Sequence, residues 1–377
     1  MEKADVFIAG AGVIGWSIAA HLLRLAPRLS VVVADKASVS GSGATGRAAG
    51  GVRAQFGTPI NIAFSLFSIR EFERVMEEVA FRQHGYLFVT SKEEGMRAMD
   101  ALTPMQQSLG VPVRRLTPAE VHDLVPILNT ADVVGATFSA TDGYLDPHLV
   151  CSLFEKEART AGARFLPSTE VLAFDGHIVS TSAGDIACRT AVLATGHWSA
   201  RLATRLGLDI PVRPGRHQLA LTGDAKGLPK HLPMVVDMDT TFHFRPEGRG
   251  LLVGYTDHLP QPVVTLDQPP PFDARFFEEL ADAALHRLPM LAEVGFDTRR
   301  SWAGWYAETP DRHAIVGKTG HWIVAAGFGG HGIMHSPAAG QAVAELVLRG
   351  ECKSFDLHAL RPSRFAEGEL TVELVVI

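Results

Sequence analysis

Apolar residues near the N-terminus form two short uninterrupted runs that flank a stretch with helical spacing. Asp5–Ala9 and Leu29–Ala34 are typical of buried strands, and Trp16–Leu25 between them has the apolar spacing of a helix. Strands that are apolar on both faces are typical of a parallel sheet covered by helices. The start of the chain therefore predicts a strand–helix–strand unit of an α/β fold.

Further along, the pattern indicates capped helices and short strands. Thr58 and Pro59 predict the start of a long helix that reaches roughly Phe81. Capping boxes are expected at Ser91–Glu94 and Thr117–Glu120. The remaining expected helices are Asp146–Ala161 (with Gly162 as its stop), Phe272–Leu288 and Pro337–Arg349, and the remaining strands are Gly85–Thr90, Ala163–Leu166, Val171–Phe174, Ala191–Ala194, His217–Thr222, Met234–Met238, Thr241–Arg245, Gly250–Tyr255 and Trp322–Ala326.

A glycine-rich turn joins the first strand to the first helix. Gly10, Gly12 and Gly15 have the spacing G-x-G-x-x-G, and Asp35 follows at the end of the next strand. Gly10 allows the turn, Gly12 lets the backbone approach a pyrophosphate, and Gly15 lets the helix pack on the strand. The helix N-terminus offers free N–H groups to phosphates, and Asp35 can accept hydrogen bonds from ribose hydroxyls. This context favours a dinucleotide site over an ordinary glycine-rich turn.

A second glycine-rich loop, Gly327–Gly332, has the same spacing and also follows a strand. After its helix, however, the chain continues as Gly350–Phe355, with no Val-rich strand that ends in an acid. We therefore do not expect this loop to hold a second nucleotide. The favoured interpretation is a helix N-terminus whose positive end faces the reactive ring of the cofactor, and the alternative is a structural strand-to-helix turn.

The expected domain organisation follows from where parallel-sheet and antiparallel-sheet patterns lie along the chain. Parallel-type segments occupy the start, a middle part and the end of the chain, whereas Val212–Tyr255 alternates strands and turns as an antiparallel sheet does. We expect an α/β fold in which a Rossmann-type domain is interleaved with an α+β domain built on an antiparallel sheet. The expected ranges are 1–81, 141–212 and 299–377 for the first domain, and 82–140 and 213–298 for the second.

Composition narrows the class of protein. The chain has 377 residues, 46 % hydrophobic and 20 % charged, which excludes a disordered chain, and its net charge of −6 gives no uniform basic field for nucleic acid. Three scattered cysteines predict neither a disulfide framework nor a zinc site and fit a reducing compartment. The apolar stretch Ala4–Ala26 follows acidic residues and holds three glycines, so neither a signal peptide nor a membrane span is expected. A cytoplasmic enzyme is the expectation.

Five separated motifs together resemble the D-amino-acid oxidase superfamily, in its group of glycine and sarcosine oxidases and the flavin subunit of L-proline dehydrogenase. In chain order they are the N-terminal fingerprint with Asp35, the loop Gly43–Phe56, the tripeptide Ala194–Gly196, and the stretches Trp302–Asp311 and Gly327–Ser336. The resemblance implies that the Rossmann-type domain binds FAD and that the other domain receives the substrate. It implies hydride transfer from the α-carbon of an amino acid or secondary amine, proline-, sarcosine- or glycine-like, to flavin N5.

The resemblance also implies which residues contact FAD. They are Gly10, Gly12, Val13, Ile14, Gly15, Asp35, Lys36, Ala44, Thr45, Arg47, Gly50, Gly51, Val171, Ala194, Thr195, Gly196, Trp198, Gly304, Gly329, Gly330, His331, Gly332, Ile333 and Met334. Such chemistry requires no metal and no nucleophile, and the sequence holds no HExxH, no paired CxxC and no G-x-S-x-G.

Arg53 is expected to bind the substrate carboxylate. A guanidinium offers two parallel donors to a carboxylate, and the position matches the arginine that has this task in sarcosine oxidases. The alternative is an arginine that binds an FAD phosphate or a surface acid. The other candidate pocket residues are Tyr255, Tyr306, His335 and His243, for which a buried side chain with an ordinary partner is the competing interpretation.

Three positions depart from the family pattern. Gly304 stands where several sarcosine oxidases carry the cysteine that tethers flavin, so FAD is expected to be non-covalent. Leu252 and Met334 stand where those oxidases carry lysines, one thought to help oxygen react and one that binds the carboxylate. An apolar residue at both points predicts a slow reaction with oxygen. The electron acceptor is therefore O₂, a quinone or a partner subunit, with a dehydrogenase expected in practice.

Two other functions compete with amino-acid oxidation. A flavin-dependent 2-hydroxyacid or glycerol-phosphate oxidoreductase shares the architecture, and a non-catalytic flavoprotein that acts as an assembly factor is known in the superfamily. Arg53 favours the first function because an unused cavity has no need of a buried cation. The sequence does not select the amino acid, its enantiomer or the oligomeric state.

Overall fold

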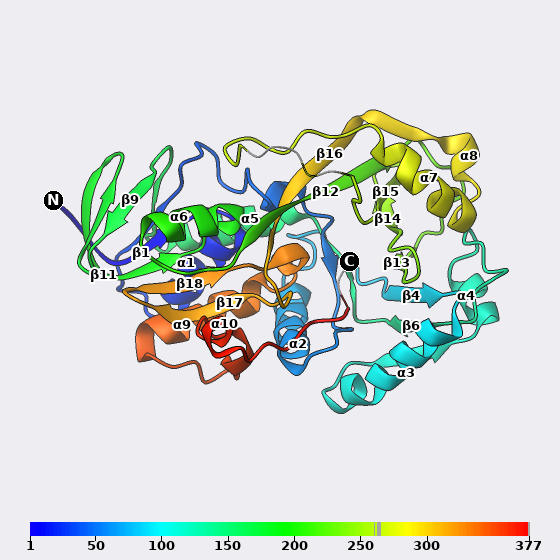
Figure 1. The fold of residues 1–377 in the computed structure, drawn as a ribbon, viewed down its shortest axis with the longest axis horizontal. Helices are drawn as coiled ribbons and strands as arrows, with labels where there is room; N and C mark the ends of the chain where they lie inside the picture. Colours follow the sequence, from blue (N-terminus) through cyan, green and yellow to red (C-terminus); the bar gives the residue numbers. More distant parts are fainter. Residues whose placement is uncertain (260, 262–264, 376–377) are drawn as a thin grey trace.

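The structure of the chain is a computed structural model, described here for all residues except 260, 262–264 and 376–377. Two eight-stranded sheets, A and C, lie toward opposite ends of the longest axis, and the long strands β12 and β16 extend from one region to the other (Figure 1). A two-stranded ladder of β3 (Gly51–Val52) and β7 (Gly143–Tyr144) completes the strands.

Sheet A has the strand order β17-β18-β11-β1-β2-β8, in which β18, β11, β1, β2 and β8 run parallel and β17 forms an antiparallel edge. An antiparallel pair, β9 and β10, is attached to β11. The strands are β1 (Glu2–Ala9), β2 (Val31–Ala34), β8 (Arg164–Leu166), β9 (Val171–Phe174), β10 (Ile178–Thr181), β11 (Gly184–Leu193), β17 (Ile315–Thr319) and β18 (Trp322–Ala326).

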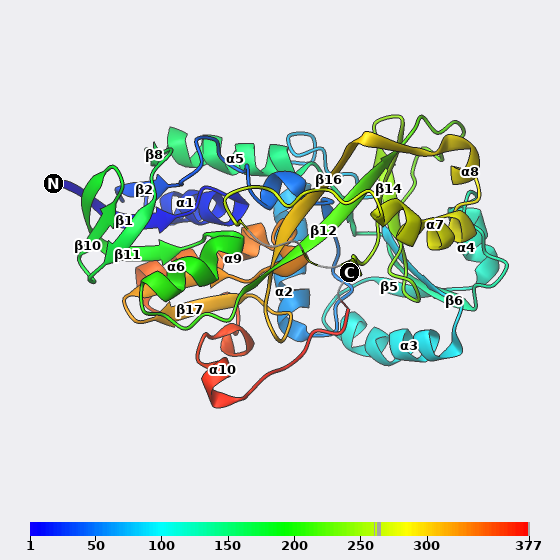
Figure 2. The same cartoon turned by 45° about the horizontal axis from the view of Figure 1, so that its top comes forward.

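Both faces of sheet A are covered, which explains why the second half of β1, Val6–Ala9, is apolar and buried. Val6 and Ile8 of β1 point into the core under α1, α5 and α9, whereas Phe7 and Ala9 pack on the opposite face, which α6 and the β9–β10 pair cover (Figure 2). The helices are α1 (Val13–Leu25), α2 (Pro59–Glu73), α3 (Glu93–Ser108), α4 (Pro118–Leu124), α5 (Pro147–Thr160), α6 (Ser199–Arg205), α7 (Phe276–Arg287), α8 (Leu291–Val294), α9 (Ser336–Arg349) and α10 (Arg364–Glu367), with short 3₁₀ turns η1 (Thr45–Arg47), η2 (Gly196–Trp198), η3 (Gly329–His331) and η4 (His358–Leu360).

Sheet C has the order β16-β12-β15-β14-β13-β4-β6-β5 and is antiparallel except where β13 pairs with β4. Its strands are β4 (Tyr86–Thr90), β5 (Val113–Leu116), β6 (Gly135–Ser139), β12 (Arg213–Thr222), β13 (Met234–Asp237), β14 (His243–Glu247), β15 (Gly250–Gly254) and β16 (Phe296–Glu308). The strands of sheet A fall within the ranges expected for the first domain, and those of sheet C within the ranges of the second, except that β16 crosses residue 298. The boundaries themselves stay a prediction.

Most expected elements are present, and the exceptions have physical reasons. The helix after Thr58 ends at Glu73 rather than near Phe81, because the chain turns back and places Phe81 against Phe72. The capping box at Thr117 and the cap at Asp146 are confirmed. Ser91 does not cap α3, because Asp239 accepts hydrogen bonds from both its N–H and its hydroxyl.

Candidate active site

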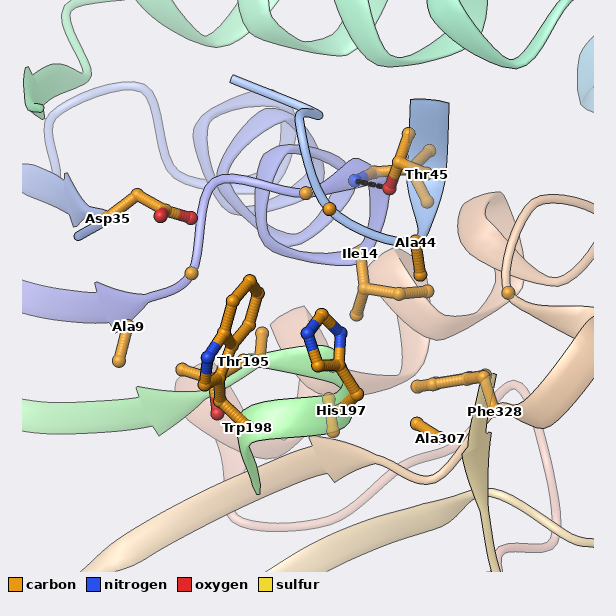
Figure 3. A pocket seen from close by; sticks show the side chains of 18 of the residues that line it. Ala9, Ile14, Asp35, Ala44, Thr45, Thr195, His197, Trp198, Ala307 and Phe328 are labelled. Carbon is orange, nitrogen blue, oxygen red and sulfur yellow. Dashed lines mark hydrogen bonds between the residues drawn. The ribbon is translucent and has the colours of Figure 1, made fainter. Parts of the chain in front are cut away.

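A cavity of about 1400 Å³, including its mouth, opens at the carboxyl ends of the parallel strands of sheet A. Its walls include Ala9 (Figure 3) as well as Ala34, Ala194 and Ala325, which lie at or next to the ends of β1, β2, β11 and β18. Ligands of open α/β sheets bind in this location because connections on both faces leave a crevice there. We call it the main cavity.

The three glycines of the first turn are each required by close contacts. A Cβ at Gly10, whose φ is +109°, would lie 2.3 Å from the carbonyl oxygen of Ala194. A Cβ at Gly15 would lie 1.9 Å from the carbonyl oxygen of Gly10, so this glycine serves packing and does not line the cavity. At Gly12, which lines the cavity, a Cβ would lie 3.2 Å from the Thr45 hydroxyl, which is also a tight contact. The contacts at Gly10 and Gly15 agree with the turn and packing roles expected for them, and the approach of Gly12 to a pyrophosphate stays a prediction.

Side chains from η1 and β2 fix this turn from outside. The Thr45 hydroxyl accepts a hydrogen bond of 3.1 Å from the N–H of Val13 at the start of α1 (Figure 3). The Asp35 carboxylate accepts hydrogen bonds from the N–H groups of Ala11 at 2.7 Å and Ala37 at 2.8 Å. Burial raises the pKa of Asp35, and these two donors oppose the shift. Asp35 also lines the main cavity, so its carboxylate lies where a ribose is expected.

An aromatic wall stands opposite the turn. Trp198 and His197, from η2, have ring centroids 3.7 Å apart, and the Lys36 ammonium lies 4.4 Å from the Trp198 ring (Figure 3). Lys36 forms an ion pair with Asp267. His197 lines the cavity but was not singled out from the sequence, where a histidine next to a glycine carries no distinguishing signal.

The loop Gly327–Gly332 closes the inner end of the main cavity. Its lining comes from Gly327, Phe328 and the one-turn helix η3, whereas α9 begins only at Ser336 and contributes no residue to the lining that the structure describes. Gly332 and Ile333, which join η3 to α9, line it as well. The expectation that a helix N-terminus in this loop faces the flavin ring stays a prediction.

The structure gathers most of the residues expected to contact FAD. Those that line the main cavity are Gly10, Gly12, Val13, Ile14, Asp35, Lys36, Ala44, Thr45, Val171, Ala194, Thr195, Gly196, Trp198, Gly329, Gly330, Gly332 and Ile333. Gly50, Gly51, His331 and Met334 line a second cavity instead. Arg47 lines neither cavity, because its guanidinium donates to the carbonyl oxygen of Ala303 at 3.3 Å, and Gly304 packs against its side chain.

The second cavity, which we call the side cavity, has a volume of about 480 Å³ including its mouth and shares Ala48, Tyr306, Gly330 and Ile333 with the main cavity. Among the described residues, no Asp or Glu lines it. Its lining consists of Ala48, Ala49, Gly50, Gly51, Arg53, Tyr86, Met234, His243, Tyr306, Gly330, His331, Ile333 and Met334.

Arg53 is the cation of the side cavity. It is 2 % exposed, and burial lowers the pKa of its guanidinium. Nη1 donates to the carbonyl oxygen of Gln55 at 2.6 Å, Nη2 donates to that of Val375 at 2.7 Å, and the group lies 3.8 Å from the Phe56 ring. No carboxylate of the described residues is within ion-pair distance of it. By contrast, the other buried arginines are paired with acids, namely Arg216, Arg245, Arg287 and Arg364.

The polar neighbours of Arg53 in the side cavity are uncharged near neutral pH. Burial raises the pKa of Tyr86 and that of Tyr306 to about 12, so both hydroxyls keep their protons. Burial lowers the pKa of His243 to about 4, and burial together with Arg53 lowers the pKa of His331 well below its usual value. The side cavity therefore presents a single positive charge within an otherwise neutral lining.

Two predicted catalytic residues lie outside both cavities. Tyr255 packs against the apolar core of the second domain and the ring of His258. His335 shares a hydrogen bond of 3.0 Å with the Ser65 hydroxyl in the core, and burial lowers its pKa to about 3, so it is neutral. Leu252 is also buried away from the cavities, in an apolar cluster with Leu219.

Tyr86 and Met234 are side-cavity residues that sequence reasoning missed. They lie directly opposite each other in the parallel pair of β4 and β13, strands that are far apart in the chain. No local signal could have placed them together, because strand pairing of this kind depends on the whole sheet.

The main cavity fits a dinucleotide such as FAD. The glycine turn leaves room for a pyrophosphate, and Asp35 and the Trp198 wall stand along the same cavity. Within the described part of the chain, no cluster of three or more His, Cys, Asp or Glu side chains could hold a metal ion. No helix of that part is long and apolar enough to cross a membrane.

Comparisons with known proteins agree with this site. Residues 5–346 match the family model described as FAD dependent oxidoreductase. The fold is similar to that of an L-proline dehydrogenase from P. horikoshii (TM-score 0.90, 30 % identity, 98 % of this chain and 99 % of the other) and of a glycine oxidase from Geobacillus kaustophilus (TM-score 0.83, 27 % identity, 97 % and 99 %). In sequence, the chain is 28 % identical to the mitochondrial dimethylglycine dehydrogenase of Mus musculus over 98 % of its own length but only 45 % of that enzyme. The protein therefore belongs to the D-amino-acid oxidase family and is an FAD-dependent oxidoreductase.

Proposed function

We propose that this enzyme oxidises the Cα–N bond of a small amino acid or N-alkyl amino acid, proline-, sarcosine- or glycine-like. The observation that carries the proposal is Arg53, a buried cation without a carboxylate partner in the described structure, placed in a cavity that adjoins the main cavity. A buried charge is costly unless it is compensated, so a bound carboxylate is its expected counterpart.

The related proteins support this substrate class. Their names specify L-proline, glycine, dimethylglycine and, for an enzyme of Paenarthrobacter nicotinovorans with 28 % identity, 4-methylaminobutanoate. The chain spans about half the length of the last two enzymes, 45 % of each. These two relatives therefore support only the flavin-dependent oxidation of the substrate, and not any activity of the parts of those proteins that this chain does not match.

In this proposal the main cavity binds FAD and the side cavity binds the substrate carboxylate. The main cavity would hold FAD through the Gly10–Gly15 turn, Asp35 and η3, and bound FAD supplies the acceptor for the hydride of the substrate α-carbon. Arg53 holds the substrate carboxylate in the side cavity. No Asp or Glu among the residues that the structure describes lines this cavity to stabilise an ammonium group, so the amine binds in its neutral form. Tyr306 lines both cavities and therefore stands beside the reacting atoms.

The test is Arg53→Lys in the holoenzyme. We expect it to weaken binding of small carboxylates by about 2–5 kcal/mol, because a two-pronged charged contact is lost, while FAD content stays unchanged. Binding is measured by the change in flavin absorbance with propionate, and propionamide, which lacks the charge, is the matched control. If Arg53→Lys empties the protein of flavin, Arg53 belongs to the cofactor site and the proposal fails.

Turnover with amino acids and an artificial electron acceptor separates the competing functions. A 2-hydroxyacid oxidoreductase would also use Arg53 but would oxidise lactate rather than sarcosine or proline. A glycerol-phosphate enzyme would bind a phosphate ester, for which the described lining of the side cavity offers one cation, Arg53. A non-catalytic assembly factor would bind no small carboxylate at all.

We further propose that FAD is held without a covalent bond and that the acceptor is a dye, a quinone or a partner subunit rather than oxygen. Gly304 offers no tether, and neither Leu252 nor Met334 brings a cation near the cavities. The neutral His335 supplies none in their place. Acid precipitation should leave flavin in the supernatant, and substrate-reduced enzyme should be reoxidised faster by a dye than by air-saturated buffer. Reoxidation by air as fast as turnover would make the protein an oxidase.

A further inference from the structure

The segment 370–375, near the C-terminus, lines neither cavity, but it contacts Arg53, which lines the side cavity. After α10 it runs past α2 toward sheet C (Figure 1). Residues 370–372 are exposed, and over 372–375 the side chains alternate, with Glu373 and Val375 buried and Leu374 exposed. Glu373 and Val375 therefore face the protein.

Glu373 anchors this segment at the start of α2. Its side chain is fully buried, and Oε2 accepts hydrogen bonds from the Thr58 hydroxyl at 2.7 Å and the Asn61 amide at 2.9 Å. Oε1 accepts from the N–H of Gly57 at 2.8 Å and from the N–H of Val375 at 2.9 Å. Four donors thus hold one carboxylate, and one of them belongs to the segment itself.

Val375 connects this anchor to Arg53. Its carbonyl oxygen accepts the hydrogen bond from Nη2 of Arg53, as the carbonyl oxygen of Gln55 does from Nη1. The Val375 side chain packs in the apolar cluster that contains Tyr86 and Met234, both part of the side-cavity lining. A guanidinium has five N–H groups, so two carbonyls fix its plane and leave other donors for a ligand.

We propose that Glu373 is a positioning residue for substrate recognition. By fixing segment 370–375 on α2, it places the Val375 carbonyl that orients Arg53, and so it sets the affinity for the substrate carboxylate without lining either cavity. The inference rests on the proposed function, because it takes Arg53 as the group that binds the carboxylate. It adds a residue from the far end of the chain, which no motif indicates.

The experiment compares Glu373→Ala, Glu373→Gln and the wild type as holoenzymes, with propionate and propionamide as ligands and flavin absorbance as the signal. Alanine removes the anchor, so propionate affinity should fall at least tenfold while propionamide affinity stays within twofold. Glutamine keeps one acceptor oxygen and the shape, so most of the propionate affinity should return. Glu369→Ala, which removes an exposed partner of Arg361 next to the segment, is the control and should leave both affinities unchanged.

The outcomes separate the inference from the proposed function. Equal propionate affinity in Glu373→Ala and wild type overturns the inference alone, and so does an equal loss in Glu373→Gln and Glu373→Ala, which would assign the effect to the charge. Wild type that binds no propionate overturns the proposed function and the inference with it. If Glu373→Ala does not fold, Thr58→Val is used instead, because this variant removes one of the four donors to Glu373. A smaller selective loss of propionate affinity in Thr58→Val supports the inference, and an unchanged propionate affinity overturns it.

Discussion

Gly10 carries the closest steric constraint of the dinucleotide turn. Its φ of +109° suits glycine, and a Cβ there would collide with the Ala194 carbonyl at 2.3 Å, an atom of the backbone that cannot turn aside. We predict that Gly10→Ala yields protein with little or no FAD, because the turn must open where the pyrophosphate is expected. The measurement is flavin absorbance per protein after purification.

Gly184 provides a matched control for that variant. Its φ of +114° is similar, but a Cβ there would meet no atom within 4 Å. Gly184→Ala therefore carries the backbone strain alone, roughly 1–2 kcal/mol, and should retain full flavin. Equal flavin content in the two alanine variants would contradict the steric argument for Gly10.

At the scale of elements, helix α5 shows how a local cap supports the dinucleotide helix. Asp146 accepts hydrogen bonds from the N–H groups of His148 and Leu149, and α5 packs against α1. We predict that Asp146→Ala lowers the free energy of unfolding by about 1 kcal/mol, because two donors of the first turn lose their acceptor. Asp146→Asn keeps an acceptor and should retain most of the stability. The measurement is urea unfolding, and an unchanged midpoint in Asp146→Ala would count against the cap.

At the scale of the whole molecule, Asp142 makes stability depend on pH. It is fully buried beside Gln55, and burial raises its pKa from 3.8 to about 7, although the N–H of Ala54 opposes the shift. Between about pH 4 and pH 7 the folded protein binds a proton that the unfolded chain has lost. The contribution of this proton to the free energy of unfolding is therefore fully present below about pH 4 and is lost progressively as the pH rises through about 7.

We predict that the free energy of unfolding of wild type falls relative to that of Asp142→Asn as the pH rises from 5 to about 7 and levels off by about pH 8, because asparagine stays neutral whereas the buried aspartate becomes charged. The slope should be on the order of 1 kcal/mol per pH unit or less. Buried histidines such as His243 and His335 have lowered pKa values and act in the opposite direction, losing stability as the pH falls below 6.5, but they are common to both proteins and cancel. Urea unfolding at several pH values is the measurement, and a difference that does not vary with pH would refute the assignment.

Features that depend on neighbouring residues in the chain could be predicted from the sequence. The order of strands and helices around Gly10–Gly15, the acid at Asp35 and the cap at Asp146 all follow from short-range periodicity and turn chemistry. The resemblance implied that Arg53 binds the substrate carboxylate, and in the structure Arg53 lines the side cavity, next to the main cavity. How the main-cavity residues contact FAD stays a prediction.

Which distant side chains meet at the side cavity depends on the tertiary structure. Tyr255 and His335 are predicted catalytic residues, but their side chains pack in the core and line neither cavity. The pairing of β4 with β13 instead places Tyr86 and Met234 in the side-cavity lining. The same holds for Glu373, which lies 320 residues after Arg53 in the chain and is joined to it through Val375. The direction of a side chain and the register of remote strands depend on the packing of the whole molecule, which no local pattern encodes.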